Sequence, residues 1–509
     1  MSGKPVAAAG AAASRATTSA AALANSPRAT LKFTEKRELI LDGAARLFNR
    51  RGIKAGTLAE VAADVGLATN SLTYYYRKKE DLVCACLLRS IAAIDQRIEQ
   101  AALAPTLAGR VKTFIHGFVG LMADVAEQRR PELIFFGDMR ALPRELVEPA
   151  FSAYENMYRH LRRLLRPQPA AGGPSSTTRT TRSTNNTGNT GNTSHSSLQA
   201  RRALNARTHL LLAQVMWSRA WLTRYEPADY PRAAQAMADI LLHGLAGPGQ
   251  GWASTPPPAP STPAVADGDD ALGDAYLRTA TRLINDHGVG GASVERIAAA
   301  LALTKGSFYH HHDTKHGLVD ACFERTFALI RRVQLAALAQ PGNGWQRLLA
   351  ASVPLVAMQD PAQPGLPNPL LRLTAWTELP GALRWDKFTS LNRLGERYAA
   401  LVLDGMLDGS IRLVDPTVAA QLVCGAINAL AEIGHWLPVA NGGIGSRTIT
   451  ITEPTIPLVE LFARPLLLGL LAASPADAAP ADAAPADAAP ADAESATAAP
   501  DHRSPTGES

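Results

Sequence analysis

The chain has 509 residues, enough for about three or four domains of ordinary size. A hydrophobic content of 46% with 19% charged residues excludes a collagen-like or wholly disordered chain, and an aromatic content of only 6% favours helices over β-sandwiches. The net charge of +6 is uneven: residues 1–250 carry +14 and the remainder −8, so the first half is suited to a polyanionic partner.

The N-terminal segment and the cysteines indicate the compartment. Residues 1–30 are rich in Ala, Ser and Thr; they resemble a transit peptide in composition but lack an amphipathic pattern, so we predict a disordered arm. Four cysteines without a C-x-x-C pair predict free thiols in a reducing compartment. No run of about 18 apolar residues occurs, which predicts no membrane span. We therefore expect a cytoplasmic protein.

Three further segments have compositions that cannot bury a core. Residues 167–197 are rich in Ser, Thr, Asn and Gly and predict a disordered insertion. Residues 247–270 are rich in Pro and Gly and predict an interdomain linker. From residue 474 the unit Ala-Asp-Ala-Ala-Pro repeats, which predicts a disordered acidic tail.

The two blocks between these segments have the apolar spacing of helices. Each block opens with apolar residues at i, i+4, i+7 and i+8, followed by a glycine where a helix would end. These residues are Ile40, Ala44, Leu47, Phe48 and Gly52 in the first block, and Tyr276, Ala280, Leu283, Ile284 and Gly288 in the second. The short β-branched run 448–452 is interpreted as a loop.

An internal repeat relates the two blocks. Shifting the chain by 236 residues aligns 37–83 with 273–319 without a gap, with 13 identities in 47 positions. Cys86 also falls on Cys322. The period is too long for a solenoid, so the repeat indicates a duplicated unit.

A helix-turn-helix pattern lies inside each copy. In the first, Thr57 and Glu60 form a capping box that predicts the start of a helix, and Gly66 permits a sharp turn into a second short helix that ends at Tyr76. A preceding helix over 35–51 provides the surface on which both pack. Three helices with a tight turn between the last two are the helix-turn-helix arrangement.

Such a unit presents the start of its third helix to the DNA major groove, where small polar side chains reach base edges and hydroxyl or basic groups reach phosphate. Arg77 and Lys78 add positive charge beside that helix in the first copy. The candidate DNA contacts are Thr57, Thr69, Asn70, Ser71, Tyr74, Tyr75 and Lys79 in the first copy, and Ser293, Thr304, Lys305, Ser307, Tyr309, His310, His311 and Lys315 in the second.

The stretches 66–82 and 303–315 resemble the helix-turn-helix signature of the TetR family of bacterial transcriptional regulators. The resemblance covers about 50 residues in each half. It implies an all-helical regulator in which each unit has a small DNA-binding head and a larger helical C-terminal domain for dimerisation and often for ligand binding. Family members generally act as homodimers that pair their last two helices into a four-helix bundle.

The two copies depart from the family pattern to different extents. The turn glycine is Gly66 in the first copy but Ala302 in the second, and Arg77 corresponds to Asp313. The acidic residue usual after the lysine is Glu80 in the first copy but His316 in the second. We therefore expect the first head to be the better DNA reader.

We predict an all-α, sequence-specific regulator of transcription, a repressor by analogy with the family, with double-stranded DNA as partner and a small-molecule effector as a further candidate. The two units are expected to pair within one chain as a pseudo-dimer, through helices 199–224, 231–245, 416–437 and 454–472. The predicted domains are a disordered arm (1–30), a first head (31–83) and helical domain (84–246, with the insertion 167–197), a linker (247–270), a second head (271–319) and helical domain (320–473), and a disordered tail (474–509).

Two alternatives from other classes stay open. One is a helical ligand- or protein-binding scaffold with degenerate heads, which would not need the basic, Tyr-rich first head. The other is an enzyme, although the chain has no Walker, G-x-G-x-x-G, G-x-S-x-G or H-E-x-x-H motif. We therefore predict no catalytic residues and no cofactor.

The histidines of the second head and the aromatic residues of the first helical domain each allow two interpretations. His310, His311, His312 and His316 have a spacing that can hold a metal, but they also fit phosphate-facing positions of the family pattern, so no metal site is predicted. The aromatic residues of 198–224 could line a ligand cavity, but ordinary packing is the favoured interpretation, and ligand-binding residues remain unassigned.

Overall fold

The structure is a computed structural model of the chain. It describes residues 27–53, 56–134, 136, 144–166, 190–252, 269–302, 314–360, 369–373, 375, 379–433 and 456–472. Within these ranges every regular element is helical, apart from an isolated β-bridge between Ala246 and Ile411. None of the helices in these ranges combines the length and apolar character that a membrane crossing requires.

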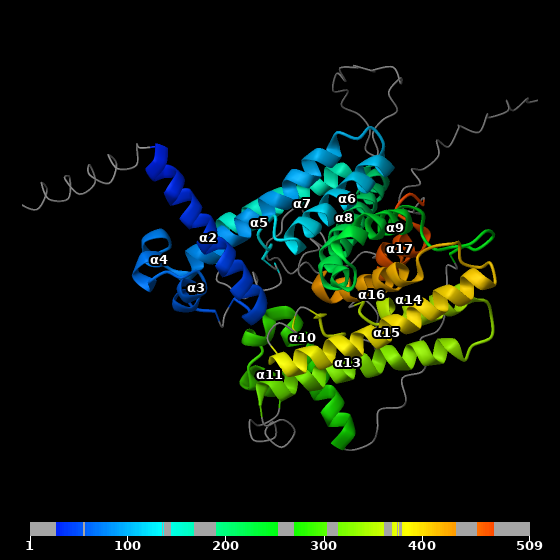
Figure 1. The fold of residues 1–509 in the computed structure, drawn as a ribbon. Helices are drawn as coiled ribbons and strands as arrows, with labels where there is room; N and C mark the ends of the chain where they lie inside the picture. Colours follow the sequence, from blue (N-terminus) through cyan, green and yellow to red (C-terminus); the bar gives the residue numbers. More distant parts are fainter. Residues whose placement is uncertain are drawn as a thin grey trace, which may run out of the picture.

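The first unit consists of a three-helix head and a five-helix domain. The head projects from the body of the molecule (Figure 1). Its helices are α2 (Pro27–Arg51), α3 (Leu58–Asp64) and α4 (Thr69–Tyr75). The helical domain contains α5 (Lys79–Ala102), α6 (Leu107–Ala126), α7 (Arg144–Leu164), α8 (Thr190–Trp221) and α9 (Tyr230–His243), with short 3-10 turns at Leu222–Arg224 and Pro227–Asp229.

The second unit repeats this order. Its head contains α10 (Asp269–Gly291), which is kinked at Gly288, and α11 (Val294–Ala300). Its helical domain contains α13 (Lys315–Leu338), α14 (Gly344–Ala357), α15 (Gly381–Leu407), α16 (Pro416–Ile433), the π-helical turn η5 (Val459–Ala463) and α17 (Arg464–Leu468). Both heads lie on the same side of the molecule in Figure 1.

The same polar contacts tie each head to its own helical domain. Asn49 donates from Nδ2 to the carbonyl oxygen of Leu133 (2.9 Å), and Asn285, 236 residues later, donates to that of Leu370 (2.8 Å). Further equivalent pairs are Arg89–Glu38 and Arg325–Asp274, and Cys86 with the carbonyl of Leu41 and Cys322 with that of Leu277. The duplication inferred from the sequence is therefore present in the packing as well.

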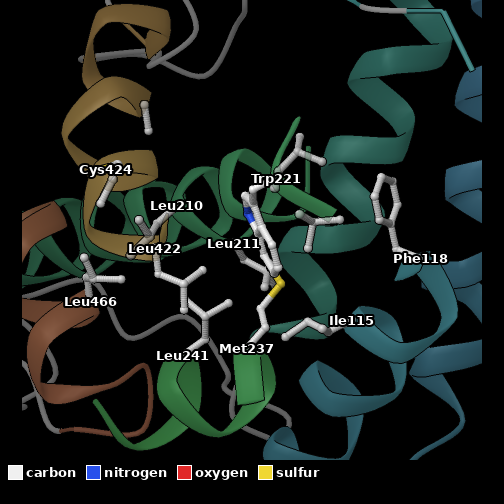
Figure 2. Packing of buried hydrophobic residues seen from close by; sticks show 14 of the residues in the cluster. Ile115, Phe118, Leu210, Leu211, Trp221, Met237, Leu241, Leu422, Cys424 and Leu466 are labelled. Atoms are coloured by element: carbon white, nitrogen blue, oxygen red, sulfur yellow. The ribbon is translucent and has the colours of Figure 1, made fainter. Parts of the chain in front are cut away.

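The helical domains of the two units share one hydrophobic core. Figure 2 shows side chains from α6, α8 and α9 of the first unit meeting side chains from α16 and α17 of the second. Two side chains of α8 donate hydrogen bonds to the backbone of α16: the buried Gln214 Nε2 to the carbonyl of Leu422 (2.8 Å), and the partly buried Trp217 Nε1 to that of Gln421 (3.1 Å). Side chains of the first unit are therefore hydrogen-bonded directly to the backbone of the second unit.

The ends of α9 and α17 also pair through their backbones. Leu245 N donates to the carbonyl of Leu467, and Leu470 N donates to that of Leu241, each over 2.8 Å. Gly244 (φ 71°) and Gly469 (φ 95°) lie at this crossing, in backbone conformations that side chains with a Cβ rarely adopt. A Cβ on either residue would lie within 2.7 Å of backbone atoms of the other unit, which explains glycine at both.

Two segments predicted to be disordered are helical at their C-terminal ends. Helix α2 begins at Pro27, so the last four residues of the predicted arm 1–30 are helical; proline is well suited to a first helical turn. Helix α8 begins at Thr190, so the last eight residues of the predicted insertion 167–197 are helical, as a continuation of α8. Residues 1–26, 167–189 and 473–509 lie outside the described part of the chain.

The linker predicted over 247–270 is wrong at both ends, because residues 247–252 pack on the second unit and α10 begins at Asp269. Gly247 N donates to the carbonyl of Ser410 (2.9 Å), and Trp252 Nε1 donates to Glu460 (2.6 Å). These partners satisfy polar groups that a free linker would expose to water. Residues 253–268 lie outside the described residues.

The last predicted helix, 454–472, is shorter in the structure. The π-helical turn η5 and α17 cover 459–468, and Gly469 ends them with a positive φ. Helix α16 corresponds to the helix predicted over 416–437, of which residues 434–437 lie outside the described part, as do the loop residues 448–452.

Candidate nucleic-acid interface

The turn of the first head is built from short-range contacts. Thr57 caps α3: its hydroxyl accepts from Glu60 N (3.2 Å), and Thr57 N donates to Glu60 Oε2 (3.0 Å). The Thr57 hydroxyl also donates to Glu60 Oε2 (3.0 Å), and this bond, together with the one from Thr57 N, lowers the pKa of the Glu60 carboxyl. Gly66 has a φ of 67° and turns the chain towards α4. The predicted capping box and turn glycine are confirmed.

Helix α4 presents a polar face to solvent. Leu72 is fully buried and α4 packs on α3, which orients the helix, while Thr69, Asn70 and Ser71 are all exposed at its first turn. The hydroxyl of Thr73 donates to the carbonyl of Asn70 (2.9 Å) and is therefore turned back onto the helix. The three exposed side chains are free to meet base edges in a groove that admits a helix.

An aromatic cluster extends this face. The ring of Phe33, on α2, lies 4.9 Å from that of Tyr75 and 6.4 Å from that of Tyr74, and the two tyrosine rings are 5.3 Å apart. Tyr74 is 76% exposed, so its hydroxyl reaches solvent beside α4, whereas Tyr75 is half-buried. Phe33 was not among the predicted site residues. The sequence did offer a signal for it, because this apolar residue stands just before the charged start of the helix predicted over 35–51.

Basic side chains surround the polar face. Lys32 and Lys36 on α2 and Arg77 and Lys78 before α5 are exposed. Lys79 is half-buried, and desolvation lowers the pKa of its ammonium group. The lysines of α2 add to the predicted set and lie on the same head as Phe33.

Three arginines near the end of α2 are engaged within the head. Arg46 and Arg50 each lie 3.2 Å from a carboxylate oxygen of Asp64, and Arg51 pairs with Glu60. These pairs tie α2 to α3, so the charge that faces outward beside α4 comes from the lysines and Arg77.

The second head is described only in part. Ser293 caps α11 by accepting from Arg296 N (3.3 Å), and Lys315 is exposed at the start of α13. Ala302 has a φ of 54°, the same left-handed conformation as Gly66. The predicted contacts Thr304, Lys305, Ser307, Tyr309, His310 and His311, and with them His312, lie outside the described residues.

The first head also contacts the second unit. Arg384, near the start of α15, donates from Nη1 to the carbonyl oxygen of Arg50 over 2.8 Å. Burial lowers the pKa of the Arg384 guanidinium. Helix α15 therefore contacts the last turn of α2, within the first head.

The two heads match a known family of proteins. The family model described as bacterial regulatory proteins, tetR family, matches residues 40–86 and 277–322, which are the two heads. The TetR family transcriptional regulator PfmR from Thermus thermophilus is 17% identical, over 40% of this chain and 95% of its own, with a TM-score of 0.28. AibR in complex with isovaleryl coenzyme A and operator DNA is 23% identical, over 39% and 97%, with a TM-score of 0.31. No curated protein sequence matches the chain.

The paired helix-turn-helix heads on an all-helical body define a DNA-binding regulator of transcription. More specifically, both heads match the model of the tetR family, so the chain contains two tandem TetR-type DNA-binding domains. Contact between DNA and the individual side chains named above stays a prediction.

Proposed function

We propose that this protein is a repressor that binds an operator with both heads while its two units pair within one chain as a pseudo-dimer. The proposal includes a cytoplasmic location and action by binding rather than by catalysis. Its main support is the shared core of α8, α9, α16 and α17. By the family resemblance, the corresponding helices of other members pair two separate chains.

The contacts between the units favour pairing within the chain. Gly425 on α16 has no room for a Cβ, because Gln214 Oε1 and Trp217 Cδ1 lie 2.6 Å from the position that it would take. Such close packing leaves this surface unavailable to a second copy. We expect light scattering to give the mass of one chain, 53.9 kDa, at micromolar concentration. A mass of two chains would contradict the pseudo-dimer.

The two heads differ in charge where they would approach DNA. The first helix of the first head carries Lys32, Lys36 and Arg37, whereas the corresponding positions of the second head are Gly268, Leu272 and Gly273, none of which is charged. Positive charge supplies most of the affinity for the phosphate backbone. Because the symmetry of an operator mirrors that of the protein, we expect two unlike half-sites, with the first head contributing most of the affinity.

In vitro site selection tests this function. The full-length protein is challenged with a randomised duplex pool at about 0.15 M salt, since the affinity of such proteins depends steeply on salt. We expect an enriched site with two unlike half-sites. A perfect palindrome would contradict pairing within the chain. No enrichment by a folded protein would favour the alternative, a helical scaffold with degenerate heads.

Two variants separate base reading from phosphate contact. Asn70→Ala should weaken binding to the selected site by about 1–3 kcal/mol while sparing random DNA. Arg77→Ala should weaken both and reduce the slope of log affinity against log salt by about 0.9. Arg332→Ala, an exposed arginine on α13, is the matched control and should change neither.

Release by a small apolar effector is part of the proposal, and a small cavity in the second unit supports it. The cavity has about 20 Å³ of free volume, and α15 contributes Leu391, Leu394 and Tyr398 to its lining. This is room for about one water molecule, so an effector would have to widen it. The same helix reaches the first head through Arg384, so a shift of α15 would move α2.

A ligand screen by thermal shift tests the effector site. A compound that raises the melting temperature of the wild type and releases DNA should do neither in Leu394→Phe, which fills the cavity. An equal shift in both proteins would place the effector elsewhere.

A further inference from the structure

Three side chains that can ligate a metal converge on the outer side of the first helical domain. Asp95 and Glu99 are one turn apart on α5, and His160 faces them from α7. His160 Nδ1 lies 2.9 and 3.1 Å from the two carboxylate oxygens of Asp95. One donor atom from each of the three residues lies within 4.8 Å of the others.

These distances suit a shared ion. Zinc is held at about 2.0–2.2 Å by imidazole nitrogen and carboxylate oxygen, so its ligand atoms lie within about 4.4 Å of one another. Glu99 is exposed, so a small rotation of its side chain closes the remaining gap. Three protein ligands leave one tetrahedral position for water, as in open zinc sites.

The cluster itself contains two acidic side chains and one histidine. Among the described ion pairs, Asp95 pairs only with His160, and Glu99 takes part in none. Two carboxylates and one imidazole leave a net negative charge even when the histidine is protonated. A divalent cation would neutralise it.

The second unit shows that the fold does not require these residues. Helices α5 and α13 correspond residue for residue at the 236-residue offset, which places Arg331 at the position of Asp95 and Leu335 at that of Glu99. Both are exposed, so the second unit packs α13 without acidic residues there. The cluster is therefore a property of the first unit alone.

We propose that Asp95, Glu99 and His160 bind a divalent first-row transition metal ion, with zinc as the favoured ion because an imidazole and two carboxylates suit it. This departs from the expectation of no metal site drawn from the sequence. It does not rest on the function proposed above. The ion would cross-link α5 to α7, and α5 directly follows the first head, so metal would restrict the movement of that head relative to α7.

The test counts bound zinc in the full-length chain. Because His310, His311 and His312 could bind metal independently, all proteins carry asparagine at these three positions. After treatment with a chelator and dialysis, titration calorimetry with Zn²⁺ should give one ion per chain. Co²⁺ should give the visible absorption of a tetrahedral site with nitrogen and oxygen ligands.

Two variants test whether His160 and Glu99 bind the ion. His160→Ala and Glu99→Gln should each abolish the bound ion or weaken binding at least tenfold, and Glu99 is exposed, so its variant keeps the fold intact. Asp124→Asn, another half-exposed acid of the same domain, is the control and should retain the ion. An absence of bound zinc, or unchanged binding in Glu99→Gln and His160→Ala, would overturn the proposal. Either result leaves DNA binding to be judged by site selection.

Discussion

Replacing Gly244 with alanine tests the closest backbone contact between the two units. The new Cβ would lie 2.3 Å from the carbonyl carbon of Leu468 and 2.4 Å from the carbonyl oxygen of Leu467, both in the second unit. Gly244 also has φ 71° and ψ −161°, a region that residues other than glycine rarely occupy. Alanine must therefore strain its own backbone and push the second unit away.

The expected cost follows from these two effects. Backbone strain in such a region costs about 1–3 kcal/mol. Retreat of the second unit breaks the hydrogen bonds from Leu245 N to Leu467 and from Leu470 N to Leu241, each with a net value of about 0.5–1.5 kcal/mol. We expect Gly244→Ala to lose about 2–6 kcal/mol of unfolding free energy.

Gly249→Ala is the matched control. Gly249 has a φ of 76°, but a Cβ on it would meet nothing within 4 Å, so only the conformational cost of about 1–2 kcal/mol remains. Urea unfolding followed by tryptophan fluorescence and by far-UV circular dichroism compares the two variants. If both lose the same stability, the two units do not pack as closely as described, and the argument for pairing within the chain loses its basis.

Further predictions concern single positions. Ala302→Gly should raise the unfolding free energy by about 0.5–1 kcal/mol in thermal or urea unfolding, because it relieves the positive φ of Ala302. Thr57→Ala should destabilise the first head by about 1 kcal/mol at neutral pH through loss of the cap. Because Thr57 lowers the pKa of Glu60 below 4.5, stability is lost as pH falls through that lowered pKa, and melting temperatures measured through this acidic range should fall less in Thr57→Ala. Burial raises the pKa of Cys322 to about 11 and those of Cys86 and Cys424 to about 12, so these three thiols should resist a disulfide reagent at neutral pH and react after unfolding in urea.

The features that the sequence predicted correctly depend on residues close together along the chain. The capping box joins positions 57 and 60, and Gly66 acts through its own backbone freedom. The duplication needed only a comparison of the chain with itself. Such patterns are legible because the interactions that cause them are local.

The features that the sequence missed depend on distant partners. Residues 247–252 have the composition of a linker, yet Gly247 is held by Ser410, which lies 163 residues further along the chain. The three candidate metal ligands are likewise split between positions 95–99 and 160, and only the packing of α7 on α5 brings them together. The composition of a segment predicts whether that segment folds by itself. It does not predict these contacts, because they depend on residues of other segments that pack against it.

Joining two units in one chain releases each head from the constraint of symmetry. In a homodimer, one substitution alters both heads; here a change at Ala302 leaves Gly66 untouched. The contacts that anchor the heads are kept in both copies, as in Asn49 and Asn285, whereas the side chains beside the expected DNA contacts differ, as in Arg77 and Asp313. Divergence at that surface is what an operator with unlike half-sites requires. A scaffold that had lost its affinity for DNA would not need exposed Tyr74 and the surrounding lysines on the first head.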